Sequence, residues 1–440
     1  MDTTLETHYD AIVVGAGAGG LFTAARLTKL GYRTLVVEAL DKVGGRASTT
    51  EVDGFKVNDG AIVIEVGGIT QQTCEEVGAK FEIREPSPPI LYRIKGKDVD
   101  VTGGGWGFLL QKLTRQGAKL VTGIGAARND SGLPEDELST ADWVRKYTKN
   151  EGVHGIFRNM CASVFAVSSE ELPARVFLTY FTRKSAFKRF GFHPQGTIGL
   201  WLALVEAIEA NGGTVLLSTP DRAIHVEEGR AVGVTVEHRG EQLRLATPVV
   251  VSNVGPWATR DLVGAEDLPA DYLATLDGSY RPCAMITVNF ASQKRLVAAP
   301  GMLSFAQSRR LAYLANYTDI CPEMAPEGWS LYVGTGVPDP AIGDFDEAAN
   351  TELLMQDLRE QIPNFDQDAR ILSVVVTRDD WPPQRAVAGY DLPHDTPVAG
   401  LWNVGDAVKE YANGGTTACA ESAQIIVDKV VGQFPVTKTT

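Results

Sequence analysis

The sequence has few of the residues that build disulfide frameworks and metal sites. Five cysteines occur among 440 residues, an odd number without any C-x-x-C pair, and the six histidines are scattered without metal-ligand spacing. A disulfide-stapled extracellular domain is therefore not expected, and reduced thiols in a cytoplasmic protein are the simplest interpretation. No structural or catalytic metal site is predicted.

Long apolar runs and an excess of positive charge are also missing. No run of 18 apolar residues occurs, so no transmembrane helix is expected. The opening residues MDTTLETHYD lack the basic and apolar regions of a signal peptide. The net charge is −14. It argues against nucleic acid as a partner, because phosphate binding needs clustered cations, and against attraction to anionic membranes.

The remaining composition is that of an ordinary globular protein rich in glycine. Hydrophobic residues make up 44% and charged residues 22%, and there are 45 glycines, so a packed core is expected. The segment from about 105 to 194 has a mostly helical pattern, and a helix is expected over 345–362. Alternating patterns predict strands at 283–290, 311–317, 329–336 and 369–377.

The most informative motif stands near the N-terminus. Residues 11–14 form a short apolar run typical of a buried parallel strand. Gly15, Gly17 and Gly20 then fit G-x-G-x-x-G. The first glycine permits a tight turn, the second lets the backbone approach a pyrophosphate, and the third lets helix and strand pack closely. A helix is expected over 21–30.

A second strand, 34–37, ends in Glu38, which lies near the spacing of the acid that binds a ribose 2′-hydroxyl in dinucleotide-binding folds. An acid there favours a free hydroxyl over a 2′-phosphate. The alternative is a glycine-rich surface turn without a ligand. The motif predicts an FAD or NAD site, and by itself it leaves the two open.

Two more groups of residues favour FAD. Gly45-Arg46 follows the second strand, and such an arginine can contact a pyrophosphate bidentately. Gly405-Asp406 ends a strand predicted over 400–407, and a helix predicted over 416–432 begins at Thr416. A carboxylate there can bind a sugar-alcohol chain, and a helix N-terminus at the flavin N1–C2=O edge stabilises negative charge. NAD needs no such C-terminal element.

Several segments carry a family resemblance: GAGAGG…VVE…VGGRAST…DGF…NDGA, then HPQGTIGLWLALVEAIEANGGTV, and finally WNVGDA…GGTTACAESA. Together they resemble the FAD-dependent amine oxidase and phytoene desaturase superfamily, and most of all its phytoene desaturase branch. The resemblance implies an α/β fold, with a glutathione-reductase-like FAD-binding Rossmann domain and an interleaved α+β substrate domain. It implies that FAD is lined by Gly15, Gly17, Gly20, Glu38, Gly45, Arg46, Gly60, Ala61 and Asp406; Thr416 is added as a candidate.

The domains are expected to be discontinuous. The FAD-binding domain is predicted to comprise 1–66, 193–265 and 390–440, and the substrate-binding domain 67–192 and 266–389.

The chain departs from the amine oxidases in one respect. Members of that group often hold substrate between two aromatic side chains in front of the flavin. The segment from Trp381 to Tyr390 resembles the one that supplies the first, but Gly415 stands where the second is expected. No cysteine stands beside Tyr390, so non-covalent FAD is predicted.

The leading functional hypothesis is an FAD-dependent oxidoreductase that abstracts a hydride from an apolar or alicyclic small molecule and forms a C=C bond, α,β to a ketone in one version. Tyr390 and Tyr411 are the catalytic candidates, because a phenol can serve as base or as hydrogen-bond donor to a carbonyl, and Trp381 is a substrate-binding candidate. Oxygen or a quinone is the expected electron acceptor. The alternatives are an amine oxidase forming C=N, a flavin-dependent double-bond isomerase and a flavin-binding protein without catalysis.

Overall fold

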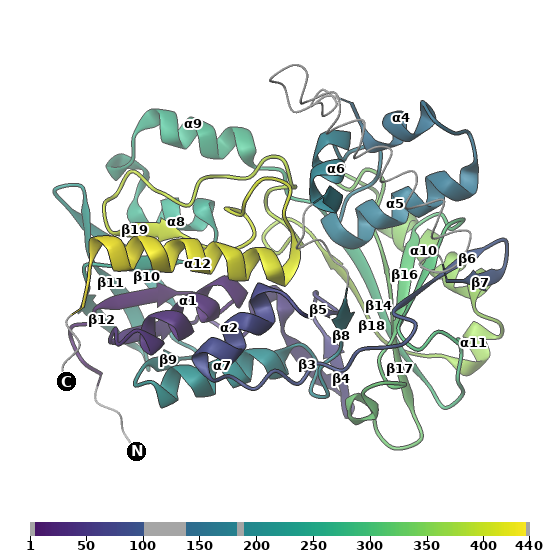
Figure 1. Cartoon of the computed structure of the whole chain (residues 1–440), viewed down its shortest axis with the longest axis horizontal. Helices are drawn as coiled ribbons and strands as arrows, with labels where there is room; N and C mark the ends of the chain where they lie inside the picture. Colours follow the sequence, from purple (N-terminus) through teal and green to yellow (C-terminus); the bar gives the residue numbers. More distant parts are fainter. Residues whose placement is uncertain (1–4, 101–137, 183–188, 437–440) are drawn as a thin grey trace.

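The computed structural model describes residues 5–100, 138–182 and 189–436. They form two lobes that lie side by side in Figure 1, each with its own main sheet. Segments from the beginning, middle and end of the sequence contribute to the first lobe, as the mixture of purple, teal and yellow at the left of Figure 1 shows. The fold is a mixed α/β fold.

The first lobe is built on a five-stranded parallel sheet. Every residue of the central strand and of its two neighbours is buried, which explains why their sequences are continuous apolar runs rather than alternating ones. The strands lie in the order β19 (Leu401–Asn403), β13 (Val250–Ser252), β1 (Ala11–Val14), β2 (Thr34–Val37) and β9 (Thr214–Leu216).

The two faces of this sheet are covered differently. Ala11 and Val13 pack into a core with the helices, whereas Ile12 and Val14 pack with an antiparallel three-stranded sheet. The helices are α1 (Ala18–Lys29), α2 (Ile69–Val77), α7 (Ile198–Ala210) and α12 (Gly415–Gln433) (Figure 1). The antiparallel sheet consists of β10 (Asp221–Glu227), β11 (Arg230–His238) and β12 (Glu241–Ala246), and α8 (Pro256–Val263) and α9 (Ala270–Ser279) follow it in the chain.

The second lobe is built on a mixed seven-stranded sheet. One face packs Val288 and Phe290 against α10 (Glu347–Gln361) and α11 (Phe365–Asp368). The other face packs against α4 (Thr140–Arg145), α5 (Glu151–Phe165) and α6 (Ala174–Thr182). The strand order is β18 (Arg370–Thr377), β14 (Met285–Ser292), β17 (Ser330–Gly336), β16 (Leu311–Asn316), β15 (Met302–Phe305), β6 (Ile90–Ile94) and β7 (Lys97–Val99).

Short elements connect the lobes. A two-stranded antiparallel pair, β5 (Ile64–Glu65) and β8 (Phe190–Gly191), lies at their junction in Figure 1. The hairpin of β3 (Thr49–Val52) and β4 (Phe55–Asn58) lies beside it, and the single 3₁₀ turn η1 (Gly45–Ala47) precedes the hairpin. These elements place the segment after β2 between the two sheets.

The structure agrees with the predicted strands and corrects some boundaries. The helix expected over 21–30 starts earlier, at Ala18, because the glycine turn leads directly into it. The strand expected over 400–407 stops at Asn403, since Gly405 takes a φ of +113° that a strand does not allow. The segment 101–137, which includes the first part of the stretch expected to be helical, lies outside the described residues, as does 183–188.

One buried histidine makes the first lobe sensitive to acid. His394 is 8% exposed, its Nε2 is 3.0 Å from the Ser422 Oγ, and burial followed by the nearby charge of Lys429 lowers its pKa to about 4. The unfolded chain therefore binds one more proton than the folded chain between about pH 6.5 and 4. We expect the free energy of unfolding to fall across that window as pH falls, by about 2–3 kcal/mol from this residue.

Chemical denaturation of the wild type and of His394→Asn between pH 4 and 8 measures this contribution. The variant is expected to lose that part of the slope, whereas His8→Asn, at an exposed position, is expected to keep it. Identical slopes for all three proteins would contradict the assignment.

Candidate functional site

The strongest candidate site lies where strands of the first sheet end. The chain passes from β1 to β2 on one side, and β13 and β19 lie on the other side of β1. The carboxyl ends of β1 and β13 therefore flank the point at which the strand order reverses. Open parallel sheets bind their ligands in the crevice at such a point.

The glycine turn after β1 has the geometry that the motif requires. Gly15 has a φ of +94°, and a Cβ on Gly20 would overlap the Gly15 carbonyl oxygen. Gly17 is the N-cap of α1, and no side chain caps that helix. The first N–H groups of α1 are thus left without side-chain acceptors, which makes this helix end suited to an anion.

Two other glycine segments approach this turn closely. Gly17 forms an isolated bridge with Gly44, and a Cβ on Gly45 would lie 3.7 Å from the Gly17 Cα. A Cβ on Gly19 would lie only 3.0 Å from the Gly405 Cα, although the two glycines are far apart in sequence. Three backbone segments therefore meet at this edge of the sheet: the turn after β1, Gly44–Gly45 after β2, and Gly405 after β19. The space that they border is called the crevice below.

Glu38 is placed at the end of β2 beside the turn. It is 8% exposed, and its carboxylate accepts hydrogen bonds from the N–H of Ala16 at 2.7 Å and of Leu40 at 2.9 Å. Burial raises the pKa of Glu38, and these N–H donors oppose the rise. Its contact with a ribose hydroxyl stays a prediction.

Arg46 and Asp406, expected to act on different parts of a dinucleotide, are brought into direct contact. Arg46 Nη2 lies 2.5 Å from Asp406 Oδ1 and Nη1 lies 3.1 Å from Oδ2, a bidentate pair. Burial alone would raise the pKa of Asp406, but Arg46 and then Lys409 outweigh it and hold that pKa below its usual value. Gly60 and Ala61 support the arginine turn, because the Ala61 N–H donates to the Arg46 carbonyl at 3.0 Å and a side chain on Gly60 would overlap that oxygen.

Thr416 lies in the first turn of α12, the longest helix of the first lobe. Its hydroxyl donates a hydrogen bond to the Glu65 carboxylate of β5. Asp406 follows Gly405, which approaches Gly19, so it lies near the glycine turn. The roles of Asp406 and of the start of α12 toward a flavin stay predictions.

The aromatic candidates border the same region. Arg46 Nη1 donates to the Pro383 carbonyl at 2.6 Å, which ties the segment after Trp381 to the Arg46–Asp406 pair. Trp381 is 43% exposed, Tyr390 is 40% exposed and Tyr411 is 37% exposed. Their side chains are thus accessible, and their roles toward substrate stay predictions.

Three residues that the sequence interpretation missed stand in the crevice. Asn253 follows β13, and its amide group fills the space beside Gly17, Gly19 and Gly405. Arg385 packs beside Gly255, donates to the Asp380 carbonyl, and has its pKa lowered by burial and then by the charge of Arg46. Glu65 is the third. None of these three residues belongs to a sequence motif. Their proximity to the glycine turn and to the Arg46–Asp406 pair arises only when the chain folds.

A dinucleotide fits these residues. The uncapped end of α1 suits a pyrophosphate. A Cβ on Gly17 would overlap the Asn253 amide and one on Gly20 would overlap the Gly15 carbonyl oxygen, so the close backbone packing of this turn requires glycine. Arg385 forms no ion pair within the described residues, so a cation is available beside Arg46.

Comparison with known proteins agrees with this geometry. Residues 18–431 match the family model described as flavin containing amine oxidoreductase. The chain belongs to this family. The protein is an FAD-dependent oxidoreductase, and the proteins that it resembles include phytoene desaturases and a solved putrescine oxidase.

Three relatives illustrate the range. A solved oxidoreductase from Methanosarcina mazei is 26% identical, with a TM-score of 0.82, over 95% of this chain and 99% of that chain. An uncharacterized protein from Methanocaldococcus jannaschii is 24% identical over 86% of this chain and 89% of its own. A neurosporene-forming phytoene desaturase from Cereibacter sphaeroides is 25% identical, but the match covers 55% of this chain and 52% of the desaturase.

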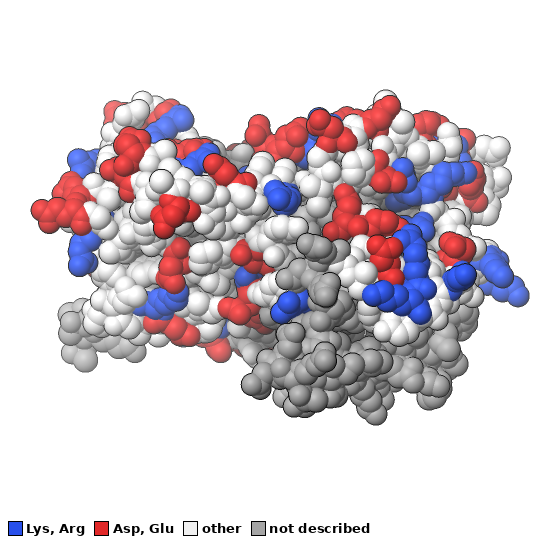
Figure 2. All heavy atoms as spheres, turned by 90° about the horizontal axis from the view of Figure 1, so that it is seen from above, with Lys and Arg blue, Asp and Glu red and all other residues white. Residues whose placement is uncertain are grey.

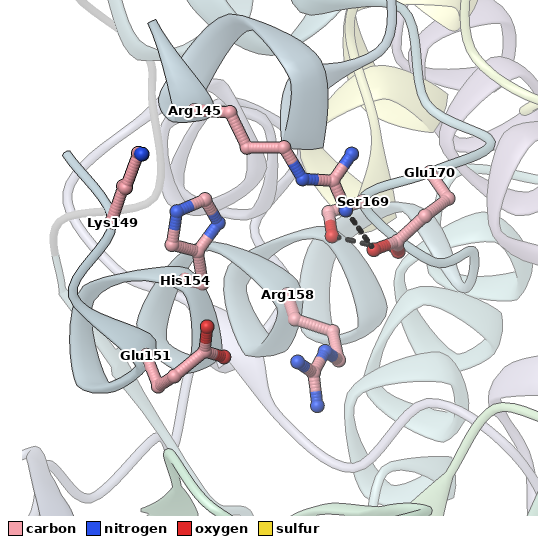
Figure 3. A pocket seen from close by; sticks show the side chains of 7 residues that line it. All are labelled: Arg145, Lys149, Glu151, His154, Arg158, Ser169 and Glu170. Carbon is pink, nitrogen blue, oxygen red and sulfur yellow. Dashed lines mark hydrogen bonds and ion pairs between the residues drawn. The ribbon is translucent and has the colours of Figure 1, made fainter. Parts of the chain in front are cut away.

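A surface pocket lies elsewhere, in the second lobe. Figure 3 shows charged side chains around it, with Arg145 and Ser169 both directed at the carboxylate of Glu170. It is lined by Arg145, Lys149, Glu151, His154, Arg158, Ser169 and Glu170. Because these residues lie on α4, on α5 and in the loops before and after α5, the pocket does not belong to the crevice.

Two wider observations complete the description. Acidic side chains intermingle with basic ones over the described part of the face in Figure 2. Within the described ranges, no helix has the length and apolarity to cross a bilayer, and no group of three or more His, Cys, Asp or Glu side chains is arranged to hold a metal ion.

Proposed function

We propose that this enzyme removes a hydride from an apolar or alicyclic small molecule and leaves a C=C bond, α,β to a ketone where the substrate has one. The observation that carries the proposal is the position of Arg281. Its guanidinium lies over the ring of Tyr390, 5.1 Å from the ring centroid. An ammonium substrate would need that aromatic face and would meet a like charge there. Gly415 stands where amine oxidases often place the second of the two aromatic side chains that hold substrate.

The cofactor site proposed here has the glutathione-reductase-like arrangement. The uncapped end of α1 would hold the pyrophosphate of FAD, Glu38 a ribose hydroxyl, Asp406 the ribityl chain, and the start of α12 the pyrimidine edge. Bound FAD supplies the two-electron acceptor. In this assignment 1–66, 193–265 and 390–440 bind FAD, and 67–192 and 266–389 bind substrate; oxygen or a quinone is the proposed final acceptor.

The second sheet supplies support for a substrate with one polar group. Thr287 pairs with Thr335, and Thr335 pairs with Tyr313 on the next strand, so three hydroxyls form a row across β14, β17 and β16. The neighbouring Val333 and Ala315 pack into the core that contains α5 and α6, which places the row on that side of the sheet. All three side chains are buried. If substrate reaches this side of the sheet, a mostly apolar lining with a few hydroxyls suits an alicyclic ketone better than a charged amine.

The experiment is an anaerobic substrate screen of the FAD-loaded enzyme, with loss of the flavin absorbance as readout. Cyclic ketones and apolar alicyclic compounds are expected to bleach the flavin. Rapid bleaching by amines alone would refute the proposal and favour an amine oxidase. Turnover of a double-bond isomer without net electron transfer would favour an isomerase, and repeating the reaction in air or with a quinone identifies the acceptor.

Tyr390 is the first residue to test. With a ketone substrate, Tyr390→Phe is expected to slow flavin reduction roughly 100-fold, because general acid–base groups contribute about 10²–10⁴ in rate, and to leave the affinity for FAD unchanged. Tyr280→Phe is the control, since Tyr280 is 38% exposed and its ring contacts Trp257 instead. An unchanged rate in Tyr390→Phe would remove Tyr390 from the mechanism and leave Tyr411→Phe as the next variant.

A further inference from the structure

The carboxylate of Glu65 closes the N-terminus of α12. Thr416 Oγ1 donates a hydrogen bond to Glu65 Oε2 across 351 residues of sequence. A Cβ on Gly415 would lie 2.5 Å from Glu65 Oε1. A side chain from β5 therefore caps a helix made of the last part of the described chain.

The dipole of α12 and the hydrogen bonds from its first turn compensate the charge of the Glu65 carboxylate. No ion pair joins Glu65 to a cation in the described part of the chain. Burial raises its pKa, and the donors from Thr416 and Thr417 oppose that rise. A negative charge at a helix N-terminus is favourable, most of all where it is partly buried.

The other titratable groups around Glu65 are either in ion pairs or uncharged. On α12, burial raises the pKa of the Cys419 thiol to about 12, so it is neutral at ordinary pH. Beyond Cys419 lies the Arg46–Asp406 pair, which is internally compensated. On the β8 side, Arg189 lies beside Gly67 and forms its ion pair with Glu85 at 2.5 Å. Of these groups, the Glu65 carboxylate is therefore the one that can take up or release a proton without breaking an ion pair.

The same helix end is the one assigned above to the flavin pyrimidine edge. A flavin that accepts two electrons and one proton gains one negative charge, which would then share the α12 terminus with the Glu65 carboxylate. Two like charges a few ångströms apart do not both persist at a buried site, and a carboxylate relieves the repulsion by protonation.

We propose that Glu65 takes up one proton when the bound flavin is reduced, so that reduction at this site consumes two protons for two electrons. In the balanced step the electrons and one proton go to the flavin, as a hydride from substrate or from a chemical reductant plus a proton, and the second proton forms the O–H bond of the Glu65 carboxylic acid. On reoxidation the proton leaves. The inference rests on the proposed FAD placement but not on the identity of the substrate.

The test is the pH dependence of the flavin midpoint potential, with electrons supplied by a chemical reductant through mediator dyes and no substrate present. One proton per two electrons gives a slope of about 30 mV per pH unit and two protons give about 59 mV, because a tenfold change is 29.6 mV for a two-electron couple. The wild type is expected to show a steeper segment over at least one pH unit between pH 5 and 9, and Glu65→Gln is expected to show the shallow slope throughout.

Two further variants sharpen this result. Thr416→Val removes a donor to the carboxylate and is expected to move the steep segment to higher pH. Glu209→Gln, which neutralises an exposed carboxylate on α7, is expected to match the wild type. Equal slopes in wild type and Glu65→Gln would overturn the proposal, because reduction would then involve no proton bound by Glu65, whether one or two protons are taken up in total. If Glu65→Gln does not retain FAD, an unmoved segment in Thr416→Val would overturn it.

Discussion

Arg46→Met is expected to weaken FAD binding by about 2–5 kcal/mol, or roughly 30- to 4,000-fold. The variant removes the guanidinium that contacts both Asp406 and the Pro383 carbonyl, and it leaves the Asp406 carboxylate part-buried without its bidentate partner. Titration of the apoprotein with FAD, followed by quenching of flavin fluorescence, measures the loss.

Two controls separate this effect from a general loss of charge. Arg46→Lys keeps the charge but not the planar fork, so it is expected to fall between wild type and Arg46→Met. Arg222→Met breaks the exposed pair with Glu237 and is expected to change neither FAD binding nor stability by more than about 1 kcal/mol. Wild-type FAD affinity in Arg46→Met would show that the crevice is not the flavin site.

Gly20→Ala is expected to weaken FAD binding roughly 100-fold. The added methyl group would overlap the backbone carbonyl oxygen of Gly15, so α1 must move away from β1. Overpacking of this kind costs about 1–3 kcal/mol, and here it displaces the helix end proposed for the pyrophosphate. Calorimetric titration with FAD measures the affinity, and thermal unfolding of the apoprotein measures how much of the cost falls on the fold.

Gly432→Ala is the matched control, because it lies in α12 with no atom within 4 Å of the added Cβ. It is expected to leave FAD binding unchanged and to add up to about 1 kcal/mol of stability from helix propensity. If Gly20→Ala bound FAD as tightly as Gly432→Ala, the turn would not be a phosphate cradle.

The sequence predicts this crevice well where short-range patterns decide the structure. The strand at 11–14, the turn at Gly15 and the strand at 34–37 are local features, since a buried parallel strand needs a continuous apolar run and the turn needs glycine. All three can therefore be predicted without knowledge of the fold. The helix boundary at Ala18 was less predictable, because its uncapped start carries no Ser, Thr, Asp or Asn signal.

The side-chain partners in the crevice could not be predicted in the same way. The Arg46–Asp406 pair spans 360 residues and the Glu65–Thr416 contact spans 351. No local pattern relates such positions, and each of these residues is ordinary for its own segment. The burial of Glu65 depends on where β5 meets α12, which is a property of the packing between the lobes rather than of either segment.

The position of β19 beside β13 has a consequence for the order of events during synthesis. β1 is made first, but the sheet that surrounds it is completed only when Leu401–Asn403 has been added, and α12 follows later still. A ribosome-bound chain that ends before Leu401 therefore lacks β19 and α12 and has no complete crevice. In the proposed flavin site, FAD meets its complete set of contacts only after α12, which ends at Gln433, has been made, so a chain shortened before α12 is expected to lack the absorbance of bound flavin.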